Sequence, residues 1–495
     1  MKRTAILSLT AIFFLACAAL GYAADPYQPN WDSLDSRPIP SWYQDAKLGI
    51  FIHWGVYAVP SYAPKGQYAE WYWRRMGGPP KGTPKDERKG DTWEFHKRVY
   101  GEDFEYHQFA PRFKAELFDP AEWADIFHAA GAKYVCLTSK HHDGYCLFQS
   151  EEANRSWGRA WNSVDVGPER DLLGELGDAV REAGLKMGFY YSLYEWFNPL
   201  WLTDRDVYIE KHMIPQFKDV VTRYKPAIIF SDGEWDLPAE RWHSKELLAW
   251  LFNESPCREY VVVNDRWGKG IRHNHGDYYT TEYGSGMADD AHPWEENRGM
   301  GHSYGFNSNE PLDQYRTSRE LVLMFIDLVS RGGNLLLNVG PTADGRIPVI
   351  MEERLRDMGK WLDVNGEAIY GTHPWKRTRQ WTEGKRPDVE YGGEYKVKYD
   401  INDVTQKNNE GKAIVAAFLT QKEDTVYAIC PNWPGDELRI DEIKISPNTK
   451  ITMLGLEGTL ACKKIDGGIV IEIPELDPGD TPCDYAYTVK ITNTK

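Results

Sequence analysis

Polar side chains with catalytic potential follow short apolar runs in this sequence. The clearest run extends from Ile228 to Phe230, continues through Ser231 and ends at Asp232 and Gly233. Such a run is typical of a strand buried on both faces. A carboxylate at its end needs partners, because burying an unpaired charge is costly. In a barrel of parallel strands, catalytic residues lie at this end of each strand.

The other predicted strands also end in residues that can bind or transfer protons. These are His53, Lys140-His141-His142-Asp143, Tyr190 and Tyr191, Asn264-Asp265-Arg266 and Glu282, with Glu70, Trp71, Glu195, Trp196, Trp294 and Glu295 in neighbouring loops. Each alone is compatible with a structural role. Adjacent residues on a strand point to opposite sides, so only one of His141 and His142 is expected to face the barrel axis. Taken together, these side chains predict a functional rim.

Three kinds of site are compatible with this rim. A metal-dependent hydrolase needs several His or carboxylate ligands that converge on one ion, but the first strand carries a single histidine. A glycosidase needs two carboxylates, with polar groups and aromatic rings that hold a sugar. A sugar-binding module without turnover needs no second acid. The sequence has 20 Trp and 29 Tyr, which favours the glycosidase.

The elements that position these residues alternate between strands and helices. We predict strands at 48–55, 133–139, 186–192, 227–231, 260–264 and 277–282, and two weaker ones near 302–306 and 334–339. Helices are predicted from Asp119 to Gly131 and from Asp171 to Gly184, by their N-cap and glycine stop signals. About eight strands over about 320 residues predict an α/β fold, a (β/α)₈-like TIM barrel.

Beyond residue 371 the sequence has a different character. Short β-type runs at 414–419, 425–430, 469–473 and 485–491 are separated by turn-forming residues. This pattern predicts a C-terminal antiparallel β-sandwich. We therefore divide the 495-residue chain into a signal peptide (1–24), a catalytic barrel (25–371) and a β-sandwich domain (372–495).

The N-terminus and the composition indicate where the protein acts. Lys2 and Arg3 precede an apolar stretch and small residues, which predicts a secretory signal cut near Ala23 or Ala24 and a secreted or periplasmic protein. Lipidation at Cys17 is the lesser alternative. The net charge of -16 argues against nucleic acid as a partner, and no later stretch is apolar enough to span a bilayer. A homo-oligomer is compatible with the sequence.

Six motifs resemble those of the α-L-fucosidases of glycoside hydrolase family 29. They begin at Gly49, Ala69, Lys140, Phe230, Val263 and Asn334 and read GIFIHWG, AEWY, KHHDG, FSDGEW, VNDRW and NLLLNVGP. The resemblance implies a retaining exo-α-L-fucosidase that acts on fucosylated glycans without a metal or other cofactor. A related sugar such as a galactoside is the alternative substrate.

The resemblance also implies roles for individual residues. Asp232 matches the position of the family's nucleophile. The fucose-binding positions match His53, Glu70, Trp71, His141, His142, Tyr190 and Arg266.

The acid/base lies in a variable part of the family, and two residues are candidates for it, Glu282 and Glu295. A retaining pair of carboxyl groups lies about 5–5.5 Å apart. A strand end on the same rim as Asp232 holds that distance better than a loop does. We therefore prefer Glu282, which ends the sixth predicted strand, to Glu295, which we expect in the loop that follows.

Overall fold

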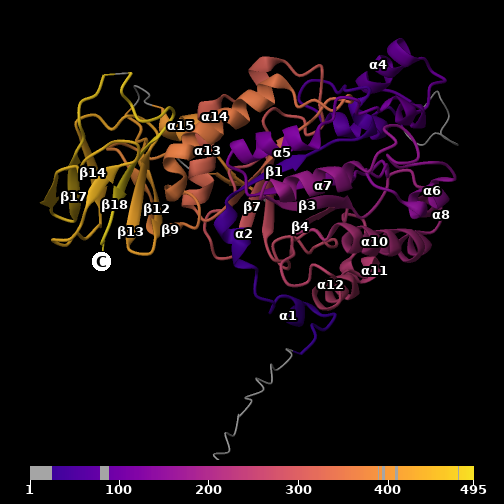
Figure 1. The fold of residues 1–495 in the computed structure, drawn as a ribbon, viewed down its shortest axis with the longest axis horizontal. Coiled ribbons are helices and arrows are strands. Elements are labelled where there is room, and N and C mark those ends of the chain that lie inside the picture. Colours follow the sequence, from indigo (N-terminus) through magenta and orange to yellow (C-terminus); the bar gives the residue numbers. More distant parts are fainter. Residues whose placement is uncertain are drawn as a thin grey trace, which may run out of the picture.

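The computed structural model describes residues 25–77, 88–387, 390–392, 396–406, 411–477 and 479–494. The predicted signal peptide, residues 1–24, lies outside this part of the chain. Figure 1 shows a larger α/β unit and, beside it, a smaller unit of β-strands formed by the C-terminal part of the chain. The helices α13 and α14 lie where the two units meet.

The larger unit is built on one curled sheet of eight parallel strands. They are β1 (Leu48–Ile52), β2 (Tyr134–Lys140), β3 (Lys186–Ser192), β4 (Ile228–Asp232), β5 (Val262–Val263), β6 (Tyr279–Glu282), β7 (Trp294–Gly299) and β8 (Asn334–Val339). Their order in the sheet is β5-β4-β3-β2-β1-β8-β7-β6. The two edge strands also approach one another, since the Asp277 amide donates to the Val263 carbonyl over 3.0 Å. The predicted barrel-like fold is confirmed.

The seventh strand does not lie where the sequence predicted it. We expected it near 302–306, but β7 runs from Trp294 to Gly299, and residues 302–306 form no strand. The β7 residues Glu295, Glu296, Asn297 and Arg298 are polar yet buried, so the apolar pattern that marks a buried strand is absent from this segment.

Fifteen α-helices are present in the described part of the chain. They are α1 (Trp31–Leu34), α2 (Ser41–Ala46), α3 (Tyr72–Arg75), α4 (Asp91–Tyr100), α5 (Pro120–Ala129), α6 (Glu151–Trp157), α7 (Leu172–Glu182), α8 (Pro199–Thr203), α9 (Arg205–Tyr208), α10 (Ile214–Tyr224), α11 (Ala239–Trp242), α12 (Ser244–Asn253), α13 (Ser318–Ser330), α14 (Val349–Asn365) and α15 (Ile401–Thr405). The predicted N-caps are confirmed. Asp119 accepts from two amides of α5, and Asp171 accepts from the Gly174 amide of α7.

The smaller unit is a sandwich of antiparallel sheets, as predicted. Its strands are β9 (His373–Trp381), β10 (Glu390–Gly392), β11 (Lys396–Lys398), β12 (Val415–Lys422), β13 (Thr425–Cys430), β14 (Glu437–Asp441), β15 (Ile451–Met453), β16 (Cys462–Ile465), β17 (Gly468–Glu472) and β18 (Tyr487–Ile491). A five-stranded sheet, β15-β18-β13-β12-β9, and a three-stranded sheet, β14-β17-β16, enclose one apolar core. A two-stranded sheet pairs β10 with β11.

A buried ion cluster joins the two units. Arg379 of β9 donates from Nε to Asp327 Oδ1 of α13 over 3.0 Å, and Arg331 of the same helix lies 2.8 Å from Asp327 Oδ2.

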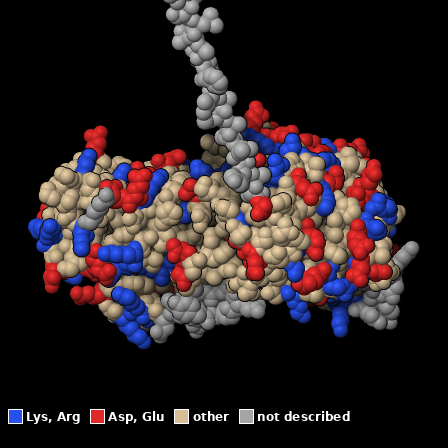
Figure 2. Space-filling view, turned by 90° about the horizontal axis from the view of Figure 1, so that it is seen from below, with Lys and Arg blue, Asp and Glu red and all other residues tan. Residues whose placement is uncertain are grey.

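On the face seen in Figure 2, acidic and basic side chains are interspersed. The six cysteines of the described chain are free thiols. No helix within the described ranges is long and apolar enough to cross a membrane.

Candidate active site

A pocket of about 130 Å³ lies at the carboxyl ends of the barrel strands. This volume is small beside the roughly 300–1,000 Å³ of pockets that take drug-sized ligands, and it suits a single sugar ring. The lining residues are Phe51, His53, Tyr68, Glu70, Trp71, His141, His142, Tyr190, Phe230, Asp232, Trp235, Arg266, Arg272, Glu282, Asn297 and Tyr304. Nine of the ten predicted site residues are among them.

Asp232, the last residue of β4, lies on the floor of the pocket among hydrogen-bond donors. Arg266 donates from Nη1 to Asp232 Oδ1 over 3.0 Å, and the Tyr190 hydroxyl donates to Oδ2 over 3.0 Å. His142 Nε2 and Arg272 Nη2 each lie 3.6 Å from this carboxylate. These contacts supply the partners that a buried carboxylate requires.

The same neighbours keep Asp232 ionised. Burial alone would raise the pKa of Asp232. The charge of Arg266, the imidazolium that His142 forms below about pH 4 and the charge of Arg272 outweigh that effect and lower the pKa to about 2. An ionised carboxylate at the end of a strand, with its oxygens directed into the pocket, has the charge state that a nucleophile needs.

Two of the pocket histidines have their protons fixed by second partners. His53 Nδ1 lies 2.7 Å from Asn338 Oδ1, an amide oxygen that can only accept, so Nδ1 carries the proton. His142 Nδ1 lies 2.6 Å from Ser192 Oγ, whose own proton goes to the Tyr194 carbonyl. Burial lowers the pKa of His53 to about 3 and that of His142 to about 4. Both rings are therefore neutral at neutral pH, and their Nε2 atoms can accept from sugar hydroxyls.

His141 corrects one expectation from the sequence. Strand alternation predicted that only one of His141 and His142 would face the barrel axis, yet both line the pocket. The reason is that β2 ends at Lys140, so neither histidine follows the strand alternation. The His141 ring stacks on Tyr190 at 5.6 Å, and its buried Nδ1 has no hydrogen-bond partner among the residues that the structure describes.

Arg266 brings Asp232 and Glu282 together. Its Nη1 contacts Asp232, and its Nη2 lies 3.2 Å from Glu282 Oε2, so one guanidinium spans both carboxylates. The Nε of Arg266 donates to Thr280 Oγ1 over 3.0 Å, which fixes the orientation of the guanidinium plane. Glu282 ends β6 and is the more accessible of the two acids, with 29% of its side chain exposed against 12% for Asp232.

Glu70 and Trp71 form another wall of the pocket. Glu70 accepts from the Gly305 amide over 2.8 Å, and burial raises its pKa to about 7. Glu70 is therefore a pocket carboxyl that can carry a proton at neutral pH. The Trp71 ring packs against Trp196 and Trp235 with centroid distances of 5.0 and 6.0 Å, and these rings give the pocket an apolar side.

Glu295 is not brought to the pocket. It is the second residue of β7 and pairs in register with Asn334, the first residue of β8. Its carboxyl accepts from the hydroxyls of Tyr43 and Tyr134 near the amino-terminal ends of the strands. Burial raises its pKa to about 8. The structure therefore leaves Glu282 as the one of the two predicted acids that faces Asp232.

Several pocket residues escaped the sequence reasoning. Arg272 lies in the long segment after β5, Tyr68 precedes Glu70, and Tyr304 lies in the segment that we predicted as a strand. Asn297 belongs to the strand that we misplaced. Arg272 follows Arg266 by six residues, and a second cation so close to a predicted strand end was a usable signal.

The comparisons with known proteins agree with this geometry. Residues 15–367 match the alpha-L-fucosidase family model, and residues 408–492 match the model of the alpha-L-fucosidase C-terminal domain. The tissue alpha-L-fucosidases of Rattus norvegicus and Homo sapiens are each 40% identical to this chain. The alignments cover 98% of this chain with 96% of the rat protein and 97% of the human one.

A solved structure shares the whole architecture. The crystal structure of Thermotoga maritima alpha-fucosidase in complex with fucose aligns with a TM-score of 0.74 and 33% identity, covering 94% of this chain and 100% of that one. The motifs, the fold and the matched length all lead to one assignment. The chain belongs to the α-L-fucosidase family, glycoside hydrolase family 29.

Proposed function

We propose that this protein is a retaining exo-α-L-fucosidase that removes terminal α-L-fucose from fucosylated oligosaccharides or glycoconjugates. The observation that carries the mechanism is the pair Asp232 and Glu282 held on one guanidinium, that of Arg266. Retaining glycosidases use two carboxyl groups in different roles, one as the nucleophile and one as the acid/base. The small pocket supports removal of one terminal sugar at a time.

In the first step Asp232 attacks the anomeric carbon of fucose, and the bond to the leaving oxygen breaks. Glu282 gives its proton to that oxygen, so the aglycone leaves as a neutral alcohol. In the second step Glu282 takes a proton from water, the water oxygen attacks the anomeric carbon, and the bond to Asp232 breaks. Two inversions give net retention of configuration.

The other predicted residues bind the sugar in this proposal. The Nε2 atoms of His53 and His142 accept from ring hydroxyls, while the Glu70 carboxyl and the Arg266 guanidinium add further polar partners. The unpartnered Nδ1 of His141 is a buried polar atom that a hydroxyl can satisfy. The Trp71 face covers the apolar side of the sugar.

The nucleophile is tested by replacing it. Asp232→Gly should lower kcat for an aryl α-L-fucoside by roughly three decades or more. Added azide should then form a fucosyl azide of inverted configuration. Unchanged turnover in this variant would contradict the assignment. Product stereochemistry followed by NMR in the wild type tests retention directly, and an aryl galactoside in the same assay tests the alternative sugar.

The acid/base is tested with two substrates of different leaving-group ability. Glu282→Ala should lower kcat/KM by about 10²–10⁴-fold for a fucosyl disaccharide. An activated aryl fucoside should be much less affected in its first step. Azide should accelerate turnover of the aryl fucoside and yield a fucosyl azide of retained configuration.

Glu70→Gln is the matched comparison, because Glu70 is a pocket carboxyl whose raised pKa lets it hold a proton near neutral pH. As a sugar-binding residue it should lose similar factors on both substrates and gain nothing from azide. Azide rescue of Glu70→Gln, with none in Glu282→Ala, would transfer the acid/base role to Glu70. Glu295→Gln should show no azide rescue. In a separate test, wild-type activity that survives treatment with a metal chelator would exclude a metal requirement.

We also propose that residues 1–24 are a secretory signal and that the mature protein is secreted or periplasmic. Lys2, Arg3 and the apolar stretch that follows them support this proposal. N-terminal sequencing of the mature protein tests it, since a start at or next to residue 25 is expected. A retained Met1 would contradict it, and a lipid-modified Cys17 would favour the lipoprotein alternative.

A further inference from the structure

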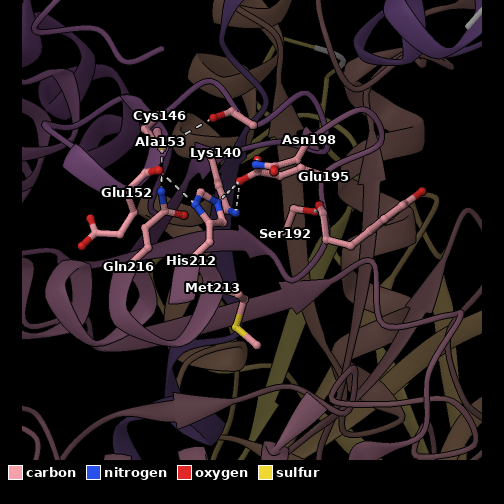
Figure 3. A network of polar contacts seen from close by, with 12 residues as sticks. Lys140, Cys146, Glu152, Ala153, Ser192, Glu195, Asn198, His212, Met213 and Gln216 are labelled. Atoms are coloured by element: carbon pink, nitrogen blue, oxygen red, sulfur yellow. Dashed lines mark hydrogen bonds and ion pairs between the residues drawn. The ribbon is translucent and has the colours of Figure 1, made fainter. Parts of the chain in front are cut away.

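Behind the pocket lies a fully buried cluster of charged residues that the proposed mechanism does not use. Its core, which we call the Glu195 cluster, consists of Lys140, Glu195 and His212 (Figure 3). All three side chains have 0% exposure. Lys140 Nζ and His212 Nε2 lie 2.5 and 2.8 Å from Glu195 Oε1. None of the three lines the pocket.

The carboxylate of Glu195 is satisfied at both oxygens. Its Oε2 accepts from Trp157 Nε1 over 2.9 Å and from Asn198 Nδ2 over 2.6 Å. Burial would raise the pKa of Glu195, but His212 and Lys140 outweigh burial and hold it well below its usual range. Four donors around one ionised carboxylate fix its position from four directions.

The cluster joins three segments that are distant in the sequence. Lys140 is the last residue of β2, Glu195 lies in the loop after β3, and His212 lies in a π-helical turn, Ile209–Met213, that leads into α10. His212 Nδ1 lies 3.2 Å from the Glu152 carbonyl, so its two nitrogens face acceptors on two segments. A π-helical turn inside a helix often marks a functional position.

One of these segments forms a wall of the pocket, and a second one packs behind that wall. His141 and His142 follow Lys140 directly, and Trp196 follows Glu195 directly. The Trp196 amide donates to the His142 carbonyl over 2.8 Å, and its ring lies 5.2 Å from the His142 ring. A shift of Glu195 therefore moves both histidines and the ring that backs Trp71.

The packing leaves no room for such a shift. Gly144 has a φ of +76°, and a Cβ atom added there would lie 2.6 Å from Glu195 Oε2 and 2.9 Å from the Trp157 ring. The carboxylate thus takes the space that any other side chain would need. We infer that the Glu195 cluster is a positioning device that holds His141, His142 and Trp196 in the geometry that binds the sugar.

The test compares Glu195→Gln with a control that breaks another buried ion pair. Glu195→Gln keeps the shape of the side chain and removes its charge. Asp277→Asn is the matched control, because Asp277 pairs with Arg37 at 3.1 Å, is buried and lies outside the pocket. For each protein we would measure Tm, kcat and KM for an aryl α-L-fucoside well below Tm, and the Kd of L-fucose by calorimetry.

We expect Glu195→Gln to lower kcat/KM and weaken fucose binding at least 10-fold. Asp277→Asn should lower Tm with kcat/KM within about 2-fold of wild type. A smaller change, Trp157→Phe, removes one donor to Glu195 and keeps an aromatic ring of smaller size, and it should shift binding in the same direction by about 3-fold. This variant answers the question if Glu195→Gln does not fold.

A double-mutant cycle with His142→Ala separates positioning from a general structural effect. If Glu195 acts through His142, Glu195→Gln should cost much less fucose affinity in the His142→Ala background than in the wild type. Losses that multiply independently would overturn the inference, as would a lower Tm with unchanged fucose binding.

The inference rests on the proposed function, but the two can fail separately. A wild type that neither hydrolyses fucosides nor binds fucose overturns the proposed function and the inference together. An active wild type whose Glu195→Gln and Trp157→Phe variants bind fucose normally overturns the inference alone.

Discussion

Removal of Arg266 should move the acid limb of the activity profile into the measurable range. Arg266 Nη1 lies 3.0 Å from Asp232 Oδ1, and both side chains are buried. Two unit charges about 4 Å apart attract by about 4 kcal/mol at an effective dielectric constant near 20. Since about 1.4 kcal/mol corresponds to one pKa unit, loss of the guanidinium should raise the pKa of Asp232 by roughly 3 units.

The sign of the effect follows from the proposed role of Asp232 as the nucleophile. A nucleophile must be ionised, so activity falls as the pH drops through its pKa. In the wild type that pKa is about 2, and no acid limb from Asp232 is expected above pH ~3. In Arg266→Met the limb should appear near pH ~5. Arg272→Met is the matched control. Arg272 Nη2 lies 3.6 Å from Asp232, and Arg272 Nε lies 2.6 Å from Glu234 Oε1, so the acid limb of this variant should shift less than that of Arg266→Met.

The assay is kcat/KM for an activated aryl α-L-fucoside between pH 3 and 8, because kcat/KM reports groups of the free enzyme. A good leaving group needs little protonation, so Glu282 contributes little to the profile. His142, with a pKa of about 4, and Glu70, with a pKa of about 7, also titrate in this range, so the limb of Asp232 is read from the ratio of variant to wild-type kcat/KM. Arg266→Met also loses a proposed contact with the sugar, which lowers the plateau of the kcat/KM profile without moving the pH of its midpoint. If the ratio of Arg266→Met to wild-type kcat/KM stays constant down to pH 3, then Arg266 does not control the charge of Asp232.

Three further predictions concern stability. Burial raises the pKa of Glu295 to about 8, so the contribution of its protonated form to stability is complete below the unfolded pKa near 4.3 and is lost as the pH rises towards about 8. Glu295→Gln should therefore flatten the fall in Tm between pH 5 and 9. Parallel Tm curves for the variant and the wild type would refute this. Gly49→Ala should lower Tm, because its Cβ would lie 2.2 Å from the Tyr134 ring, a clash that costs about 1–3 kcal/mol or more; an unchanged melting curve would contradict it. Arg379→Met removes one cation from buried Asp327, so it should lower the free energy of unfolding by about 3 kcal/mol and leave kcat/KM unaltered. A loss of activity without a loss of stability would contradict a purely structural role for this ion pair.

The sequence predicted the barrel wherever the strands are apolar. The strands at 228–232 and 334–339 are buried on both faces and carry the apolar runs Ile228–Phe230 and Leu335–Leu337, although the second strand was one of the two weaker predictions. Predicted caps such as Asp119 also held, because an N-cap depends on local hydrogen bonds alone. These are the parts of the fold that short stretches of chain determine by themselves.

Those pocket residues that lie at or near the end of an apolar strand were predictable from the sequence. Asp232, Tyr190 and His53 follow directly from strand ends, and the structure brings them together. Arg272 and Tyr304 come from long segments whose path depends on tertiary packing. No periodic pattern specifies which residue of such a segment returns to the pocket.

The two candidate acids show why a single misplaced strand matters. Glu282 pairs in register with Asn297, and both line the pocket. Glu295 lies two residues before Asn297 on the same strand, so it has the same inward direction but lies about 6–7 Å nearer the amino-terminal end. There it meets tyrosine hydroxyls in place of the sugar. Both candidates are glutamates, and only the register of a polar strand, which no apolar pattern marks, decides which of them lies at the level of Asp232.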